Sequence, residues 1–383
     1  MMNVAISVGV NLEGARGIPL FQGYLARNLA QLDHHNRYRL FGYFFRDFER
    51  KKTLISLPDQ DNFTLDIHRW PESLVNPAIY RWDLPIFWPS LKASGVNLFH
   101  STSMLTPRLP GIKTVTTVHD IMPMIFPQWV PDPSLTRHYR RWLMRADQLI
   151  CVSRHTRKDI VERLNIPEDK CVVIPQGVDT DIFHPQDPGA DLRSLRQRYK
   201  LPERYILGVG PLDPRHNLAL LIPILKGLIA TPEGRDISLV IGGARSGTYE
   251  QILKLARSAG LEDRVCFPGY VPIPDLVGIY HGAEVFIYPS LYEGFGHPPL
   301  EALACGSPVV SSDSSALPEI LEGCASLVAP QDVPGFIGST LELLRDPGLR
   351  QARKEAGIKR AASLTWRRTT ERILAVYKEV HSR

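Results

Sequence analysis

Short runs of β-branched and aromatic residues alternate with helical patterns along the whole chain, and this alternation constrains the fold more than any other feature. A first series of strand and helix patterns fills the first half of the chain, and a second series begins at Tyr205. Alternation of this kind predicts parallel sheets with helices on both faces. Two series in tandem therefore predict an α/β protein with two doubly wound domains. The runs expected to form strands are Val4–Val8, Tyr38–Phe44, Val96–His100, Thr114–His119, Gln148–Ser153, Cys171–Pro175, Tyr205–Gly210, Ile237–Gly242, Val265–Pro268, Glu284–Pro289 and Pro308–Ser312.

The two series meet in a stretch rich in Pro, Gly and Asp, Gln176–Arg204. Such a stretch favours turns over regular elements. We therefore expect an N-terminal domain over residues 1–190 and a C-terminal domain over 191–365. Residues 366–383 form an amphipathic helical pattern with no strand after it. This terminal helix can pack on either domain, including back on the N-terminal one.

Composition and charge exclude several classes of protein. A chain of 383 residues with 44% hydrophobic and 22% charged residues is typical of globular domains with more than one core. The net charge of +5 suits anionic partners such as phosphates or acidic lipids, but it lacks the clustered basic excess of a nucleic-acid-binding protein. Five dispersed cysteines without a CxxC pair favour reduced thiols. With no signal-peptide pattern and no long apolar run, we expect a cytoplasmic protein.

The segment 288–310 carries the pattern best suited to chemistry. A predicted strand runs into a loop in which Gly294 and Gly296 flank Phe295, and a pair of prolines then opens a short helix. Glycines in such a loop let backbone N–H groups approach a polar ligand closely. The loop is therefore a candidate ligand site.

Two acids lie around this loop. Glu293 precedes the helix and Glu301 lies one turn inside it. Carboxylates at the start of a helix can accept hydrogen bonds from the paired hydroxyls of a sugar or a ribose. The alternative is that the helix dipole alone favours acids there.

The spacing of Glu293 and Glu301, with seven residues between them, resembles the Glu-x7-Glu signature of the retaining glycosyltransferases of the GT-B fold. The resemblance implies two Rossmann-like domains that face an inter-domain cleft, and transfer of a sugar from a nucleotide sugar with retention of configuration. It extends over nearly the whole chain, with family 4 in particular. The matching blocks are EGFGHPPLEALACGSPVV, TTVHDIMPMIFP, RADQLICVSRHTRKDIVERLNIPEDKCVVIPQGVD, LGVGPLDPRHNL and FPGYVPIPDLVGIYHGAEVFIYPS.

The resemblance also implies roles in donor binding. Glu301 would hold the ribose hydroxyls of the donor nucleotide. Glu293 would contact the transferred sugar, together with the backbone of Gly294, Phe295 and Gly296.

The diphosphate would be bound by Arg215. A guanidinium beside a helix N-terminus suits a phosphate on physical grounds, although a solvated loop arginine has the same sequence appearance. Similar proteins usually carry Arg-Lys-Asn where this chain has Arg215, His216 and Asn217. Either Arg215 suffices, or His216 is protonated beside the phosphates, or the activity is weakened.

The first domain contributes three further candidates. Gly17, with Gly14 before it, can bring backbone N–H groups to the diphosphate, although the usual glycine after Gly17 is missing. His119 follows a predicted strand, and the resemblance places it beside the reacting sugar, while a packed or turn histidine is the alternative. Asp120 orients the acceptor or caps a turn.

The expected reaction moves a hexose, with mannose from GDP-mannose favoured, to a glycan or polyprenyl-linked acceptor in polysaccharide or O-antigen biosynthesis. No Asp-x-Asp metal motif is evident, so we expect neither metal nor other cofactor, and electrostatic stabilisation of the leaving group. UDP-, dTDP- and ADP-sugars are alternative donors, and a catalytically weak sugar-nucleotide-binding partner is a second alternative. A dehydrogenase needs G-x-G-x-x-G directly after a strand, and no predicted strand of this chain is followed by that pattern. An epimerase or a glycogen-type phosphorylase is a further rival, and the phosphorylase would need a much longer chain.

A stripe of basic residues on one predicted helix is a candidate membrane-binding surface. The segment TRHYRRWLMRAD has a helical pattern with aromatic and apolar residues beside its arginines. Such a helix can lie on an anionic leaflet on the inner face of the plasma membrane, and the alternative is a solvated face paired to acids. The arginines of the stripe are Arg137, Arg140, Arg141 and Arg145.

Overall fold

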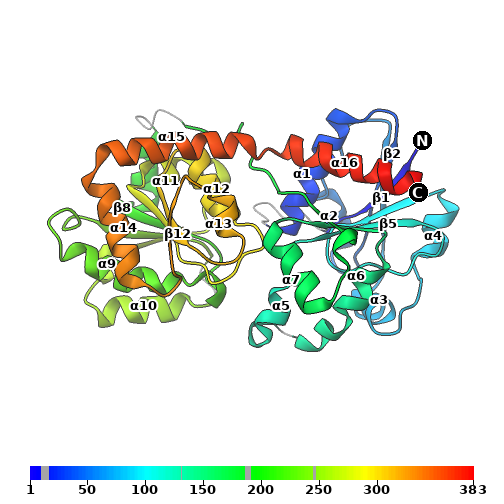
Figure 1. Cartoon of the computed structure of the whole chain (residues 1–383), viewed down its shortest axis with the longest axis horizontal. Helices are drawn as coiled ribbons and strands as arrows, with labels where there is room; N and C mark the ends of the chain where they lie inside the picture. The colour runs from blue at the N-terminus through cyan, green and yellow to red at the C-terminus, as the bar shows by residue number, and fades with distance from the viewer. Residues whose placement is uncertain (10–16, 131, 186–190, 245–246) are drawn as a thin grey trace. The chain divides into compact units, whose positions relative to one another are not determined.

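The computed structural model describes residues 1–9, 17–130, 132–185, 191–244 and 247–383. The chain divides into two compact units (Figure 1). The first comprises Met1–Gly177 with Trp366–Arg383, and the second comprises Val178–Thr365. The second unit begins at Val178, earlier in the sequence than the boundary expected at residue 190. Val178 forms a β-bridge with Thr365, the last residue of the same unit.

The first unit contains a seven-stranded parallel sheet in the order β3-β2-β1-β4-β5-β6-β7. Central β1 pairs with β2 on one side and β4 on the other, so that Ala5 lies opposite both Arg39 and Phe99. Edge strand β3 was missing from our expectations. The strands are β1 (Asn3–Ser7), β2 (Arg37–Tyr43), β3 (Phe63–His68), β4 (Leu98–Ser101), β5 (Lys113–Val118), β6 (Gln148–Cys151) and β7 (Cys171–Val173).

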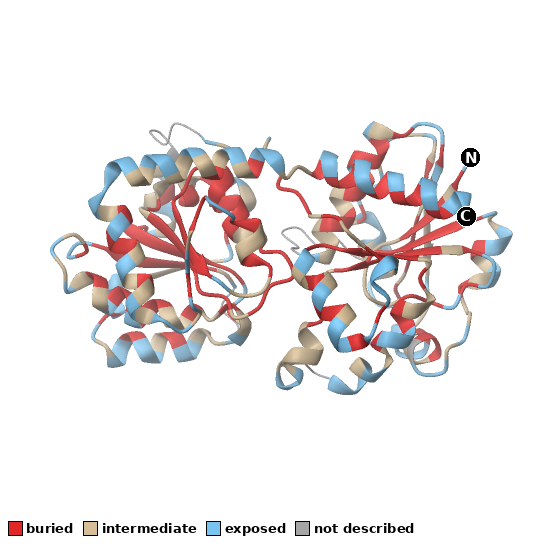
Figure 2. Cartoon of the chain, in the orientation of Figure 1, coloured by how far each residue is buried: buried red, intermediate tan, exposed pale blue. Residues whose placement is uncertain are grey.

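Helices cover both faces of this sheet (Figures 1 and 2), with their apolar sides buried against it. The α-helices are α1 (Ile18–Leu32), α2 (Phe48–Thr53), α3 (Glu72–Tyr80), α4 (Trp88–Ala93), α5 (Met122–Ile125), α6 (Tyr139–Arg145), α7 (Arg154–Leu164) and α16 (Trp366–Ser382). Three short 3-10 helices complete the described part of the unit: η1 (Pro127–Trp129), η2 (Pro133–His138) and η3 (Glu168–Lys170).

The arginines expected to form a basic stripe on α6 do not all face solvent. Arg145, the last residue of α6, forms an ion pair with Asp83 and donates to the carbonyl of Thr106 at 3.3 Å. Arg145 is half-buried by these contacts, which corrects the expectation that it lies on an exposed stripe. The apolar side of the same helix, with Trp142 and Leu143, is buried in the core beneath it.

The C-terminal helix α16 belongs to the first unit and lies beside α1 (Figure 1). The rings of Trp366 and Tyr24 stack at 4.8 Å between these helices. Further along α16, the hydroxyl of Tyr377 lies 2.5 Å from Nδ1 of His100, whose Nε2 contacts the Thr117 hydroxyl at 2.8 Å. Complete burial, and next the charge of His119, lower the pKa of His100 to about 3, so this ring is neutral near pH 7. A buried polar contact therefore anchors the end of the chain on the N-terminal sheet.

The second unit contains a six-stranded parallel sheet in the order β10-β9-β8-β11-β12-β13. Every residue of β8, β9, β11 and β12 is buried, as expected for a parallel sheet covered on both faces (Figure 2). The short edge strand β13 was not predicted. The strands are β8 (Tyr205–Val209), β9 (Ser238–Gly242), β10 (Val265–Gly269), β11 (Val285–Tyr288), β12 (Val309–Ser312) and β13 (Ser326–Val328).

The helices of the second unit surround this sheet in the doubly wound pattern, so the predicted pair of parallel α/β domains is confirmed. The α-helices are α8 (Asp191–Tyr199), α9 (Leu221–Ile229), α10 (Tyr249–Ser258), α11 (Ile273–Gly282), α12 (His297–Ala304), α13 (Leu317–Ile320), α14 (Val333–Arg345) and α15 (Pro347–Ser363). The 3-10 helices are η4 (Pro214–His216), η5 (Leu218–Leu220) and η6 (Glu262–Arg264). Across the described residues, no helix combines the length and apolar character needed to cross a membrane.

Candidate functional site

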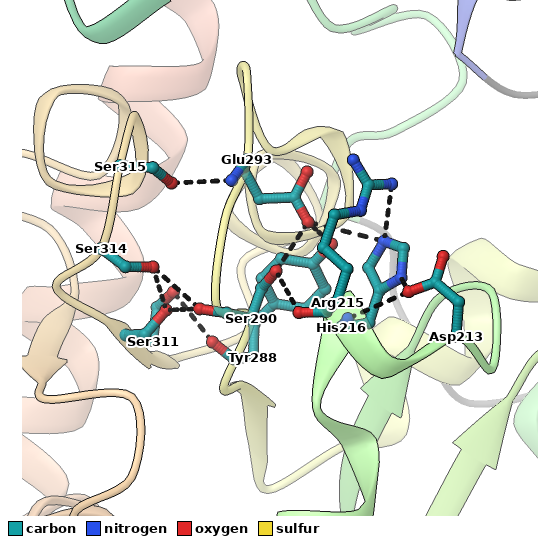
Figure 3. Close-up of polar contacts among 10 residues, drawn as sticks. Asp213, Arg215, His216, Tyr288, Ser290, Glu293, Ser311, Ser314 and Ser315 are labelled. Atoms are coloured by element: carbon teal, nitrogen blue, oxygen red, sulfur yellow. Dashed lines mark hydrogen bonds and ion pairs between the residues drawn. The ribbon is translucent and has the colours of Figure 1, made fainter. Parts of the chain in front are cut away.

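The loops that follow β8 and β11 lie next to each other, because these two strands are neighbours in the sheet. Parallel sheets bind ligands at the carboxyl ends of their strands. The backbone N–H of Leu291 donates to the carbonyl of Arg215 at 2.8 Å, and the Ser290 hydroxyl donates to the same carbonyl at 3.2 Å. Figure 3 displays the polar cluster that results. The structure therefore joins the loop of Arg215 to the loop of Glu293.

Glu293 is buried, and one of its carboxylate oxygens is held by neighbouring hydroxyls. Oε1 accepts hydrogen bonds from Tyr288 and Ser290, each at 2.8 Å (Figure 3). The backbone N–H of Glu293 donates to the Ser315 hydroxyl at 2.7 Å. Burial, and next the charge of Glu293, raise the pKa of Tyr288 well above its usual value, so the phenol remains a donor. Among the described residues, hydrogen bonds to the Glu293 carboxylate go to Oε1 and none to Oε2.

His216 is also buried, and both of its ring nitrogens contact protein groups (Figure 3). Nδ1 lies 2.7 Å from Oδ1 of Asp213. Nε2 lies 3.4 Å from Nη2 of Arg215 and 3.5 Å from Oε1 of Glu293. A protonated ring beside the phosphates was one of three alternatives that the sequence left open for His216. In the structure the ring contacts Arg215, Glu293 and Asp213.

Asp213 was not anticipated from the sequence, although it lies three residues before His216. Its Oδ1 also accepts the backbone N–H of His216 at 3.1 Å and caps η4. Burial raises the pKa of Asp213, but the hydrogen bond and charge of His216 and the charge of Arg215 outweigh it and hold that pKa below its usual value. Asp213 is therefore an anion near neutral pH and acts as an acceptor.

Asn217 ties the same loops together at another point, and sequence reasoning gave it no role. Its backbone is left-handed, with φ 54° and ψ 28°, a conformation that asparagine tolerates better than most residues. Its side-chain amide donates to the carbonyls of Pro289 and Pro330, each at 3.1 Å. The loops after β8, β11 and β13 are thereby held as one unit. Asn217 could have been found from the sequence, because it closes the Arg-His-Asn tripeptide that matches the Arg-Lys-Asn of similar proteins.

Glu301 lies in α12, which begins one residue earlier than the predicted prolines and ends at Ala304. Its Oε2 accepts a hydrogen bond from the buried Tyr280 of α11 at 3.1 Å. The N-cap of α12 is Gly296, with φ 100°, and a Cβ there would lie 2.7 Å from Leu317. Glycine is required at this position, and Phe295 before it is buried. Both acids thus flank one fixed loop, but the structure gives them different hydroxyl partners.

His119 lies in the first unit, at the end of β5, and its ring is held from both sides. Nε2 lies 3.0 Å from the carbonyl of Thr102, and the Gln176 amide nitrogen lies 2.9 Å from Nδ1. Because a carbonyl only accepts, Nε2 carries the proton and Nδ1 accepts from the amide. The carbonyl of His119 accepts from the Thr156 hydroxyl at 3.3 Å.

Asp120 and Gly17 have local structural roles. Oδ1 of Asp120 accepts the backbone N–H of Met122 at 2.9 Å, which is the turn cap that we considered as an alternative. Gly17 is the N-cap of α1 with φ 70°, a conformation that favours glycine. Gly14 lies outside the described residues. Within those residues, no group of three or more His, Cys, Asp or Glu side chains is arranged to hold a metal.

The two halves of the chain match two families of glycosyltransferases. Residues 17–182 match Glycosyltransferase Family 4, and residues 193–360 match Glycosyl transferases group 1. The chain is 31% identical over 287 residues to the O-antigen chain mannosyltransferase B of Escherichia coli, across 73% of this chain and 74% of that protein. It is 29% identical over 280 residues to the serotype-specific mannosyltransferase WbdA of Escherichia coli, across 70% of this chain. That alignment spans only 34% of the longer WbdA.

Solved structures show the same fold over the whole length. Sucrose-phosphate synthase from Thermosynechococcus elongatus has a TM-score of 0.78 at 20% identity, and the match covers 100% of both chains. Anabaena HepE in complex with UDP-glucose has a TM-score of 0.74 at 17% identity, covering 99% of this chain and 100% of that one. The chain therefore belongs to the glycosyltransferases of the GT-B fold that join a family 4 domain to a group 1 domain.

Proposed function

We propose that this protein transfers a hexose from a nucleoside-diphosphate sugar to a glycan or polyprenyl-linked acceptor, with retention of configuration and without a metal or other cofactor. One observation carries the proposal: Arg215, His216 and Glu293 meet at the carboxyl ends of two neighbouring strands. A guanidinium suits a diphosphate, and a carboxylate suits sugar hydroxyls. The two halves of a nucleotide sugar therefore find complementary groups in one cluster.

In this proposal the protein stabilises the departing diphosphate by charge and by fixed hydrogen-bond donors. Arg215 neutralises the phosphates, and the backbone of Gly294, Phe295 and Gly296 lies alongside the sugar. Oε2 of Glu293 accepts a sugar hydroxyl, because Oε1 is already bonded to Tyr288 and Ser290. No reorganisation is then needed when charge develops, since these groups are held in place before the donor binds.

The proposal also gives a role to each of the remaining candidate residues. Glu301 would hold the ribose hydroxyls, with its carboxylate oriented by Tyr280. His119 would contact the transferred sugar and Asp120 the acceptor, and Gly17 would offer its backbone to the diphosphate.

Mannose from GDP-mannose is the proposed donor, in the assembly of O-antigen or a related polysaccharide. Support comes from the two Escherichia coli relatives, both of which are named mannosyltransferases. A UDP-sugar is the first alternative, since HepE has been solved with UDP-glucose. dTDP- and ADP-sugars are the others.

The test is a panel of GDP-, UDP-, dTDP- and ADP-sugars, with two readouts on the purified full chain. Thermal stabilisation reports binding, and release of nucleoside diphosphate with a glycan acceptor reports transfer. We expect the largest response with GDP-mannose. Binding without turnover for any acceptor would favour the second alternative, a sugar-nucleotide-binding partner. No response to any nucleotide sugar would contradict the proposal.

A further inference from the structure

The buried side chain of Gln176, to which sequence reasoning gave no role, contacts the ring of His119. Gln176 lies between β7 and the end of the first unit and is only 3% exposed. Its amide nitrogen lies 2.9 Å from Nδ1 of His119. The two residues are 57 positions apart in the sequence, so the fold of the first unit creates this contact.

The backbone before Gln176 is fixed by two neighbouring elements. The Thr369 hydroxyl of α16 donates to the carbonyl of Pro175 at 2.8 Å. The backbone N–H of Ile174 donates to the carbonyl of Cys151, the last residue of β6, at 2.9 Å. The amide therefore extends from a backbone that has little freedom to carry it away from the histidine ring.

The opposite side of the ring also meets a fixed group. Nε2 of His119 lies 3.0 Å from the carbonyl of Thr102, which is completely buried. The Thr102 hydroxyl donates to the carbonyl of Ser7 and accepts from the amide of Gln22, each at 2.7 Å. Because a carbonyl only accepts, the ring donates through Nε2 and accepts through Nδ1. The amide nitrogen is therefore the end of Gln176 that faces the ring.

The groups around the ring of His119 favour its neutral form. A protonated ring would direct an N–H from Nδ1 against the N–H of the Gln176 amide. Phe21 of α1 meets the ring edge to face at 5.1 Å and carries no charge. His100 of β4 has a pKa of about 3, because burial and next the charge of His119 lower it, and so it is neutral near pH 7. Oδ1 of Asp120, the next residue, caps the following turn.

We propose that Gln176 is a positioning residue for sugar transfer, because it holds the His119 ring in one orientation and in its neutral Nε2–H form. The inference rests on the proposed function, which places His119 beside the transferred sugar. Positive charge develops on a sugar ring as its leaving group departs. A neutral histidine does not repel that charge, whereas an imidazolium would. Glutamine supplies the hydrogen bond without a carboxylate, which would favour a second proton on the ring.

The first test is Gln176→Glu, which keeps the size of the side chain and presents an acceptor to Nδ1. The ring should then carry protons on both nitrogens, so the turnover number should fall about tenfold at about pH 6.5. The difference from the unmodified chain should narrow toward about pH 8.5, where the ring loses a proton. Gln176→Met fills a similar volume without a hydrogen bond and should lower the turnover number about threefold at every pH.

Nitrogen-15 NMR of the full chain labelled at histidine reports the ring protons directly. The signal of His119 is identified by its loss in His119→Gln. We expect the unmodified chain to carry the proton of this ring on Nε2, and Gln176→Glu to carry protons on both nitrogens. The spectrum of the unmodified chain tests the tautomer even where a variant folds poorly.

The matched control is Gln31→Glu, at an exposed position of α1 in the same unit, and it should keep the pH profile of the unmodified chain. A ring protonated on Nδ1 in the unmodified chain would overturn the inference. Equal losses in Gln176→Glu and Gln176→Met at every pH would also overturn it, because a merely structural role would produce them. Absence of turnover in the unmodified chain would instead contradict the proposed function, and with it any role of Gln176 in transfer.

Discussion

Asp213 determines the tautomer of His216, because Nδ1 of the buried ring lies 2.7 Å from Oδ1 of the partly exposed carboxylate. The carboxylate is held anionic, so Nδ1 carries a proton. In the neutral ring, Nε2 then offers a lone pair to Arg215, whose Nη2 lies at 3.4 Å. In the protonated ring, Nε2 would instead donate toward Glu293 at 3.5 Å. A lysine at this position could donate but could not accept, so the histidine changes how Arg215 is held.

We therefore expect Asp213→Asn to lower the turnover number about tenfold, because a hydrogen bond to a charged group is worth about 1.5–3 kcal/mol and the amide no longer dictates the tautomer. Steady-state kinetics with the preferred donor would measure the effect. Asp236→Asn, at an exposed position of the same unit, is the matched control. An equal turnover number in Asp213→Asn and the unmodified chain would show that the pair does not position Arg215.

Glu293→Gln should keep the local fold and lose activity. The amide oxygen can still accept from Tyr288 and Ser290, whereas the negative charge that we propose for sugar binding disappears. We expect the turnover number to fall by about a hundredfold, in the range seen for removal of one preorganised group, with little change in Tm. Glu322→Gln, exposed and away from this loop, should behave as the unmodified chain.

Glu301→Gln should act on donor binding more than on turnover. Loss of a charged acceptor for ribose hydroxyls would raise the KM for the donor by about tenfold, with a smaller effect on the turnover number. Titration calorimetry with the nucleoside diphosphate alone gives an independent measure. A variant whose turnover number falls while donor affinity is unchanged would contradict the assignment to the ribose.

Gly296→Ala should destabilise the second unit through both strain and collision. The residue has φ 100°, and its new Cβ would lie 2.7 Å from Leu317. We expect a loss of about 2–3 kcal/mol in unfolding free energy, measured by urea denaturation. Gly260→Ala measures the cost of backbone strain alone, because Gly260 has φ 68° and open space around it. This variant should lose about 1 kcal/mol of unfolding free energy. Equal losses in the two variants would mean that Leu317 moves aside.

His100 should make the stability of the first unit depend on pH. Its pKa is about 3 in the folded chain and 6.5 in the unfolded reference, so the unfolded chain binds the proton between these values. The contribution is complete above about pH 6.5 and is lost as the pH falls toward 3. Between about pH 7.5 and about pH 5, the unmodified chain should lose about 2 kcal/mol more unfolding free energy than His100→Gln. Parallel losses in urea denaturation would argue against a neutral buried ring.

Most of the fold could be predicted because the central strands are short runs rich in β-branched and apolar residues, as strands buried on both faces require. β8, β9, β11 and β12 are buried at every position, and all four were expected. The two missed strands, β3 and β13, lie at sheet edges, where part of each strand remains accessible and the run is broken by polar residues or is very short. Edge strands carry a weaker hydrophobic signal for this physical reason.

The sequence by itself determined the two doubly wound domains, the glycine loop and the two acids around it, because these depend on local spacing and on periodic burial. It could not decide what His216 faces or which acid pairs with Arg145. Glu293 reaches His216 only because β8 and β11 are paired, and Arg145 meets Asp83 only in the folded first unit. Contacts between distant segments depend on how the sheets assemble, and so the tertiary structure alone decided them.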